Sequence, residues 1–255
     1  MTRSVGVVVP AYRPDVERLS AYVDTLYERL RPAAIRIELD TPRSGVPEAL
    51  ADLPATVSTI PYRRGKGRAI TAGFEALDTD ILVFTDADGS TPADSLASVV
   101  APVLDDEADL AVGSRRHPEA RISRHRTFAR RRLGDTFAWL ARRLIEPRLF
   151  DYQCGAKAIS REAWINCREH LYEPGFAWDI ELIAIAGALD QRITEIPIEW
   201  HDQPDSTVSP VKTSLALAHG LLAARHRAAL IHESRLHGAI AARREERALV
   251  DGTKR

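Results

Sequence analysis

Residues 81–92 of this 255-residue chain read ILVFTDADGSTP and pass abruptly from apolar to acidic. An apolar run of this length is typical of a strand that is buried on both faces of a sheet. Asp86 and Asp88 follow it, two positions apart in an extended segment, so their carboxylates can point to the same side. Thr91 and Pro92 then open a helix, where the missing N–H of proline costs no hydrogen bond. The stretch predicts a rigid strand that presents two carboxylates at its carboxyl end.

The same alternation of strand and helix extends over residues 5–113 and predicts an open, doubly wound α/β sheet, mostly parallel, with helices on both faces. We expect strands at 5–9, 35–39, 56–60, 81–85 and 110–112, and helices at 16–30, 65–77 and from residue 91. Ligands of such sheets bind at the carboxyl ends of the strands. Four segments fall there and could meet in one crevice: Pro10-Ala11-Tyr12, Asp40, Asp86-Ala87-Asp88 and Gly113-Ser114-Arg115.

The C-terminal part of the chain predicts a mixed α/β region without a repeat or a clear linker. We expect a loop at 151–157, helices near 161–170 and 180–189, a strand at 193–200 and a long helix from Thr213. Pro197 restricts that strand to a sheet edge or a bulge, because proline cannot donate to the ladder. We therefore predict one domain over residues 1–212 and an amphipathic helical tail over 213–255.

Residues 115–148 contain eleven arginines and an apolar stripe, which predicts a basic amphipathic helix suited to an anionic surface. Packing inside the protein and dimerisation are the alternatives. The net charge is only −1, and the basic segment lacks interleaved stacking aromatics, so we do not expect nucleic-acid binding. The oligomeric state is left open.

Composition is that of an ordinary globular protein, with 45% hydrophobic and 28% charged residues. Cys154 and Cys167 cannot build a disulfide framework and have no metal-binding spacing, so we expect a reduced, cytosolic setting. No signal peptide and no apolar run of transmembrane length are found.

Several polar residues are candidates for chemistry. Paired carboxylates such as Asp86 and Asp88 suit Mg²⁺ or Mn²⁺, although a solvated turn would also explain them. Lys66, between two glycines before a helix, could meet a phosphate or lie in a flexible surface loop. Arg115 could bind a phosphate bidentately or form a surface ion pair. Asp179 could act in a site or cap a helix.

Six blocks stand in order along the sequence: VVPAY (8–12), RGKG (64–67), FTDADGST (84–91), VGSR (112–115), DYQCGAK (151–157) and FAWDIEL (176–182). Together they resemble family 2 glycosyltransferases, and more narrowly the synthases of dolichyl-phosphate or polyprenyl-phosphate hexoses. The resemblance covers residues 5–212 and implies a GT-A fold that binds a nucleotide-sugar and Mg²⁺ or Mn²⁺. One departure is Glu38-Leu39-Asp40-Thr41-Pro42, where the family usually has two adjacent acids followed by Gly-Ser, which weakens the carry-over for base recognition.

The resemblance also implies roles for residues at the matching positions. Asp40 would face the base, and Asp179 would face the sugar or the acceptor. Asp88 would bind the metal, and Asp86 would lie near the ribose and the metal. The remaining roles fall into two sets: Pro10, Ala11, Tyr12, Lys66 and Ala87 for the nucleotide-sugar, and Arg115, Gln153, Lys157 and Lys212 for the acceptor or its phosphate.

The implied reaction is transfer of a hexose, with inversion, to a polyprenyl or dolichyl phosphate by a peripheral enzyme at the cytoplasmic face of a membrane. A phosphate acceptor is already anionic and needs no strong base. Gln153-Cys154-Gly155-Ala156-Lys157 resembles the glucose-transferring members of the family more than the mannose-transferring ones, which implies UDP-glucose as donor, with GDP-mannose second. A glycosyltransferase with a soluble acceptor and a non-catalytic membrane scaffold are the alternatives.

Overall fold

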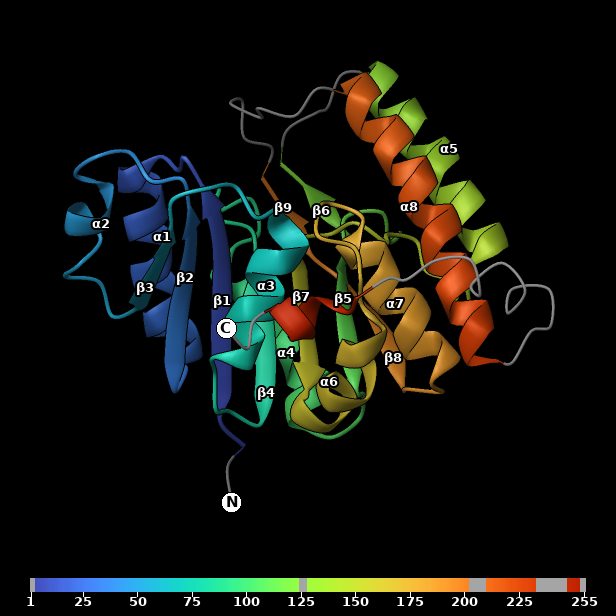
Figure 1. Ribbon diagram of the computed structural model, residues 1–255, viewed down its shortest axis with the longest axis horizontal. Coiled ribbons are helices and arrows are strands. Elements are labelled where there is room, and N and C mark those ends of the chain that lie inside the picture. The colour runs from blue at the N-terminus through green and yellow to red at the C-terminus, as the bar shows by residue number, and fades with distance from the viewer. Residues whose placement is uncertain (1–2, 124–127, 202–209, 233–246, 253–255) are drawn as a thin grey trace.

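The computed structural model describes residues 3–123, 128–201, 210–232 and 247–252, with no side chains described for 128–135 and 210–215. Its central sheet has seven strands in the order β3-β2-β1-β4-β7-β5-β8 (Figure 1). The strands are β1 (Val5–Tyr12), β2 (Ala34–Asp40), β3 (Thr56–Ile60), β4 (Ile81–Thr85), β5 (Leu110–Ser114), β7 (Ala156–Ser160) and β8 (Ile193–Pro197).

Helices cover both faces of this sheet, and each face has its own hydrophobic cluster. Successive side chains of a strand point to opposite faces: in β4, Ile81 and Val83 join one cluster and Leu82 and Phe84 join the other. The first cluster packs under α1 (Val16–Leu30) and α4 (Ala93–Leu104), and the second under α3 (Lys66–Glu75), α6 (Arg161–Cys167) and α7 (Trp178–Ala188). Short elements complete the chain: α2 (Val46–Ala49), η1 (Arg168–His170) and η2 (Leu249–Gly252).

All paired strands of the sheet run parallel except β7, which is antiparallel to both β4 and β5. The carboxyl ends of β1, β2, β4 and β5 therefore lie along one edge, which we call the carboxyl edge. Figure 1 shows the start of β1 at the opposite edge. This arrangement confirms the predicted mostly parallel sheet, and Pro197 ends β8 on the outermost strand, as expected.

The structure corrects three sequence predictions. The predicted loop at 151–157 runs into β7. Within the described part of residues 115–148, the predicted helix is formed only over α5 (Phe128–Leu144). The predicted strand at 193–200 is divided into β8 and β9 (Glu199–Trp200), and β9 pairs with β6 (Arg121–Ile122). Arg121 and Ser123 bond to distant segments instead of forming helical bonds: their backbone N–H groups donate to the carbonyls of Ile198 and Trp200, each at 3.1 Å.

The C-terminal helix α8 (Pro210–Ile231) packs against α7 and lies beside α5 (Figure 1). Its Leu217, Leu221 and Ala224 are buried in the second cluster. Glu181 of α7 is buried and pairs with Arg227 of α8. The division at residue 212 stays a prediction, but α8 shares the core of the preceding residues.

Candidate functional site

The carboxyl edge gathers the four segments that the sequence predicted to meet there. Tyr12 at the end of β1 pairs in register with Asp40 at the end of β2. Asp86 directly follows β4, and Arg115 directly follows β5. Lys66 begins α3, and Asp179 lies in the first turn of α7. The fold thus brings the predicted residues to a common edge because parallel strands end on the same side.

Four charged side chains form a row of alternating sign, which we call the charge chain: Lys157, Asp179, Lys66 and Asp86. Lys157 Nζ lies 2.7 Å from Asp179 Oδ1, and Lys66 Nζ lies 3.1 Å from Asp179 Oδ2. Lys66 Nζ also lies 2.9 Å from Asp86 Oδ1. Lys157 and Asp179 are buried, whereas the side chain of Asp86 is 42% exposed. The chain therefore leads from the interior to the surface of the carboxyl edge.

The charge chain shifts the pKa values of Asp179 and Lys66 toward their charged forms. At Asp86, burial outweighs the effect of Lys66 and raises the pKa of that carboxyl. Burial alone would raise the pKa of Asp179, but Lys157 and Lys66 outweigh it and hold that pKa below its ordinary value. Burial would likewise lower the pKa of Lys66, but the Asp179 and Asp86 carboxylates raise it above its ordinary value. Asp179 is thus a carboxylate with two cationic partners and not a helix cap, since Ala177 occupies the cap position of α7.

Two residues that sequence reasoning missed hold Asp86 and the end of β4 in place. A Cβ added at Gly155 would lie 1.9 Å from Asp86 Oδ2, so only glycine leaves room for this carboxylate. The buried Tyr22 hydroxyl bonds Thr85 Oγ1 at 2.8 Å and donates to the Thr91 carbonyl at 2.7 Å. Gly155 stood inside a quoted motif, but nothing in the sequence marked Tyr22, which reads as an ordinary core position of α1.

Asp88 is exposed and accepts one hydrogen bond, from the N–H of Ser90 at 2.9 Å, across the turn at Gly89. Among the described residues, no group of three or more His, Cys, Asp and Glu side chains is arranged to hold a metal. Two carboxylates, one of them exposed at a strand end, nevertheless provide the hard oxygen ligands that Mg²⁺ and Mn²⁺ prefer. The donor set fits such a cation when further ligands come from a substrate.

The edge near β1 and β2 departs from expectation. Asp40 is buried, and its two oxygens accept bonds from the backbone N–H and the Nε of Arg64, each at 2.7 Å. Arg64 also pairs with Glu38 at 2.9 Å. Tyr12 is partly exposed, with the Arg63 guanidinium 4.3 Å from its ring centre. Because Arg64 occupies Asp40, the expected contact of Asp40 with a base stays a prediction.

Arg115 forms a buried ion pair with Asp151, which the sequence analysis did not single out. Arg115 donates from Nε at 2.7 Å and from Nη2 at 3.0 Å. Burial alone would raise the pKa of Asp151, but Arg115 outweighs it and lowers that pKa. The backbone N–H of Asp151 donates to Glu195 at 2.8 Å. The pair joins the end of β5 to the segment before β7.

The other predicted site residues are placed as follows. The Lys157 side chain is buried and bonded to Asp179 and the Cys154 carbonyl, so the structure does not place it where an acceptor phosphate could reach. Gln153 is half-buried, and its N–H donates to Asp151 at 3.0 Å. The side chain of Lys212 lies outside the described residues. Pro10 and Ala87 are half-buried and Ala11 is buried.

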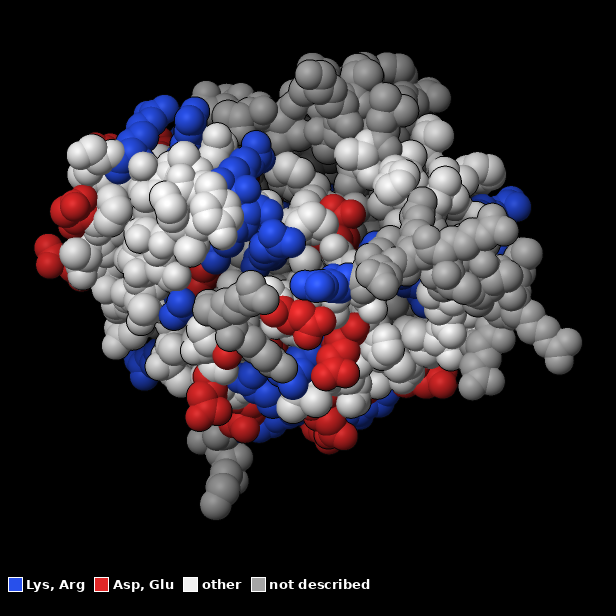
Figure 2. Space-filling model, viewed as in Figure 1, with Lys and Arg blue, Asp and Glu red and all other residues white. Residues whose placement is uncertain are grey.

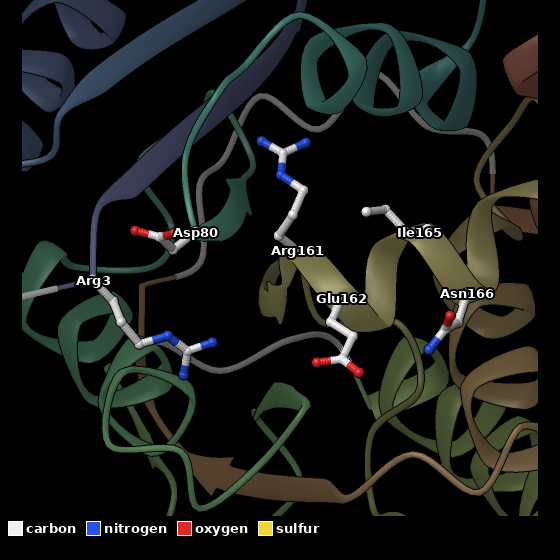
Figure 3. Close-up of a pocket in the computed structure, with 6 residues that line it drawn as sticks. All are labelled: Arg3, Asp80, Arg161, Glu162, Ile165 and Asn166. Atoms are coloured by element: carbon white, nitrogen blue, oxygen red, sulfur yellow. The ribbon is translucent and has the colours of Figure 1, made fainter. Parts of the chain in front are cut away.

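On the face shown in Figure 2, Lys and Arg side chains gather in a band that runs from the top toward the middle of the molecule. Asp and Glu side chains lie below this band, together with further Lys and Arg side chains. A separate cavity of about 320 Å³ lies at the edge opposite the carboxyl edge, between the chain before β1 and helix α6 (Figure 3). The cavity lies at the amino ends of β1 and β4, whereas the charge chain lies at the carboxyl edge, so the two are separate sites.

The chain is similar to several curated glycosyltransferases. It is 31% identical to glycosyltransferase AglD of Haloferax volcanii, over 86% of this chain and 36% of that protein. It is 27% identical to the human dolichyl-phosphate beta-glucosyltransferase, over 89% of this chain and 76% of that protein. The corresponding mouse protein is 30% identical over 67% of this chain and 54% of its own length. The chain thus spans about a third of the length of AglD and about half of the length of the mouse protein.

Solved structures show the same fold. Glucosyl-3-phosphoglycerate synthase from Mycobacterium tuberculosis, in complex with Mn²⁺, UDP-glucose and phosphoglyceric acid, superposes with a TM-score of 0.66. The superposition covers 88% of this chain and 80% of the synthase chain, at 17% sequence identity. The expected GT-A architecture is therefore confirmed. Residues 7–166 match the family model of glycosyl transferase family 2, and the chain belongs to that family.

Proposed function

We propose that this protein transfers glucose from UDP-glucose to a polyprenyl or dolichyl phosphate, with inversion, at the cytoplasmic face of a membrane. The names of its relatives support the sugar and the acceptor, because two of those described above are dolichyl-phosphate beta-glucosyltransferases. UDP-glucose is the nucleotide-sugar bound in the structurally similar glucosyl-3-phosphoglycerate synthase. GDP-mannose is the second donor to be compared. Because Arg64 occupies both oxygens of Asp40, the residue that would recognise the base is not identified.

One observation carries the choice of a phosphate acceptor: Asp179 is buried between two lysines. A hydroxyl acceptor needs a general base, and an effective base has a pKa near the working pH. The pKa of Asp179 is instead held below its ordinary value by Lys157 and Lys66, against the effect of burial. A phosphate monoester already carries between one and two negative charges at neutral pH, so it attacks without such a base.

In the proposed reaction, an oxygen of the acceptor phosphate attacks the anomeric carbon of glucose from the face opposite the diphosphate. The bond from that carbon to the diphosphate oxygen breaks, and its electron pair leaves with UDP. Asp88 and Asp86 would hold Mg²⁺ or Mn²⁺, which neutralises charge on the leaving diphosphate when bound. Lys66 Nζ lies 2.9 Å from Asp86 Oδ1, so its ammonium group would also lie beside the leaving diphosphate. Positioning and electrostatics then supply most of the rate.

The experiment compares UDP-glucose, GDP-mannose and UDP-N-acetylglucosamine with purified protein, Mn²⁺ and a polyprenyl phosphate in detergent, followed by analysis of the lipid product. We expect glucosylated lipid, with UDP release only when the lipid phosphate is present. Asp88→Asn should abolish transfer while the far-ultraviolet circular dichroism stays unchanged. Transfer to a soluble sugar instead, or full activity of Asp88→Asn, would contradict the proposal.

The membrane surface belongs to the same proposal. Among the described residues, no helix is long and apolar enough to cross a membrane. Helices α5 and α8 pack together and bury Ala141 and Leu221, which agrees with the alternative of internal packing for these faces. Their outer faces carry Trp139 and Leu222, 54% and 58% exposed, and Arg143 stacks on Trp139 at 5.1 Å. An exposed tryptophan beside arginine suits a lipid interface.

Co-sedimentation with vesicles that contain phosphatidylserine tests this surface. Trp139→Ser should weaken vesicle binding, because it removes the larger of these two exposed apolar side chains. Ile165→Ser is the matched control, since Ile165 is 49% exposed but lies on α6 beside the cavity at the opposite edge (Figure 3). Equal loss in both variants, or none in either, would remove α5 and α8 from the proposed membrane surface.

A further inference from the structure

We infer that Lys157 is a positioning residue: it orients Asp179 from inside the protein, and through Asp179 it holds Lys66 at the diphosphate end of the donor site. The inference rests on the proposed function, because it assigns Lys66 to the diphosphate of the donor. It gives Lys157 a role without contact to either substrate.

The surroundings of Lys157 explain why it acts only through neighbours. Because β7 runs antiparallel to β4, Lys157 pairs in register with Phe84, two residues before Asp86. Its side chain is 2% exposed, and Nζ donates to the Cys154 carbonyl and to Asp179 Oδ1, both at 2.7 Å. A buried ammonium is costly unless it is paired and hydrogen-bonded. The two fixed acceptors therefore determine where this charge lies.

Asp179 divides its two oxygens between the two lysines. Oδ1 accepts from Lys157, and Oδ2 lies 3.1 Å from Lys66 Nζ. Both ammonium groups also lie near the aromatic ring of Phe84: the distance to the ring centre is 5.1 Å for Lys66 Nζ and 5.5 Å for Lys157 Nζ. With both oxygens engaged, the carboxylate cannot rotate without breaking a charge-assisted hydrogen bond.

Lys66 is shared between Asp179 inside and Asp86 at the surface. An ammonium group has three N–H donors, and two of those of Lys66 face the two carboxylates, at 2.9 Å for Asp86 and 3.1 Å for Asp179. The third donor can meet a phosphate oxygen. Without Lys157, Asp179 would keep Lys66 as its sole cationic partner in the charge chain, and its full charge would draw the ammonium inward from Asp86.

The backbone on either side of Lys66 is fixed, so that only the Lys66 side chain can move. A Cβ added at Gly67 would lie 2.4 Å from the Glu173 carbonyl oxygen and 2.6 Å from Trp178, so the start of α3 is pressed against the loop before α7. The N–H of Arg68 donates to the Pro174 carbonyl at 3.2 Å. Because these contacts fix the backbone, a change of charge at Asp179 moves the Lys66 side chain rather than the loop.

A double-mutant cycle on UDP affinity, measured by calorimetry with Mn²⁺ present, tests the inference. Lys157→Met should weaken UDP binding roughly tenfold or more in the wild-type background, the effect of losing one hydrogen bond to a charged group. The same change should alter affinity less than twofold in a Lys66→Met background, because Lys157 then has nothing to position. The KM for UDP-glucose should rise in parallel.

A purely structural role makes a different prediction, namely lower stability with UDP affinity unchanged or with equal effects in both backgrounds. Either result would overturn the inference. Arg161→Met is the matched control: Arg161 donates to the carbonyls of Thr79 and Leu77 at the opposite edge, so it should lower stability and leave UDP affinity unchanged.

If Lys157→Met does not fold, Lys157→Gln takes its place in the cycle, because the amide can still bond the Cys154 carbonyl without a charge. The pair Lys157→Met with Asp179→Asn removes both charges together and should bind UDP no more weakly than Asp179→Asn alone. A further tenfold loss in that pair would contradict the inference. Wild-type protein that neither binds UDP nor uses UDP-glucose would instead refute the proposed function itself.

Discussion

Replacing Gly155 with alanine should disable the site while the fold survives. The new Cβ would lie 1.9 Å from Asp86 Oδ2 and 2.2 Å from its Cγ, far inside van der Waals contact. The two backbones cannot move apart easily, because the N–H of Asp86 donates to the Gly155 carbonyl at 3.0 Å. The Asp86 carboxylate must therefore rotate away, and it leaves its position 2.9 Å from Lys66.

The expected magnitudes differ for stability and catalysis. Overpacking a core costs about 1–3 kcal/mol, and the lower end applies here because Asp86 is 42% exposed and can swing into solvent. A shift of about 1 Å in a group that positions substrate can lower the rate on the order of 10²-fold. The variant should thus be nearly as stable as wild type but about a hundredfold less active.

The assay is UDP release from UDP-glucose with Mn²⁺ and polyprenyl phosphate, together with the thermal midpoint of unfolding. Gly6→Ala is the matched control, since its Cβ would lie 2.6 Å from Thr79 Oγ1 at the opposite edge and crowds side-chain atoms without touching the site. It should lose similar stability and keep its activity. A Gly155→Ala protein with kcat/KM within threefold of wild type would refute the reasoning.

Two further predictions concern buried ion pairs. Asp151→Asn should cost about 3–5 kcal/mol at pH 7 by leaving Arg115 uncompensated; since Arg115 lowers the pKa of Asp151 against the effect of burial, urea unfolding should show this difference shrink as the pH falls below about 4. Arg227→Met removes the partner of Glu181, whose pKa burial already raises. Because a carboxyl with a raised pKa destabilises the fold as it ionises, the deficit in thermal midpoint should grow from pH 5 to pH 8, and a constant deficit would contradict this assignment.

The alternation of strand and helix was readable from the sequence because it depends on local patterns. The buried run of β4 and the proline before α4 were both placed correctly. The convergence of Tyr12, Asp40 and Asp86 followed from one rule, that parallel strands end at the same edge. Local pattern and a rule of topology were sufficient for this part of the fold.

The strand β7 was missed for a physical reason. Its five residues, AKAIS, carry a lysine at the second position, and so short a segment of mixed polarity is not distinguishable from a loop by periodicity. Only the insertion of β7 between β4 and β5 shows that Lys157 is buried. The resemblance therefore led to a phosphate contact for Lys157, whereas the sheet order turns its side chain toward Asp179.

The partners of Asp40 and Arg115 were missed for a related reason. Arg64 stands 24 residues after Asp40, and Asp151 stands 36 residues after Arg115, so neither pair has a local signal. For the same reason the basic helix was predicted too long. Residues 121–123 form backbone hydrogen bonds with partners near residue 200 instead of within a helix. Contacts between distant segments decided both outcomes.

The charge chain shows why the candidate site depends on the whole fold. Its members come from β7, α7, α3 and the end of β4, and Lys66 and Asp179 are 113 residues apart in the sequence. Two ammonium groups face two carboxylates, so each buried charge has a partner of opposite sign and the chain is neutral as a unit. Loss of any one member leaves a charge without compensation, which costs more than the pair contributes. Motifs identify Lys66, Asp86, Asp179 and Lys157 alike, but the contact of Lys157 with Asp179, through which we infer that it positions Lys66, appears only when β7 is placed in the sheet.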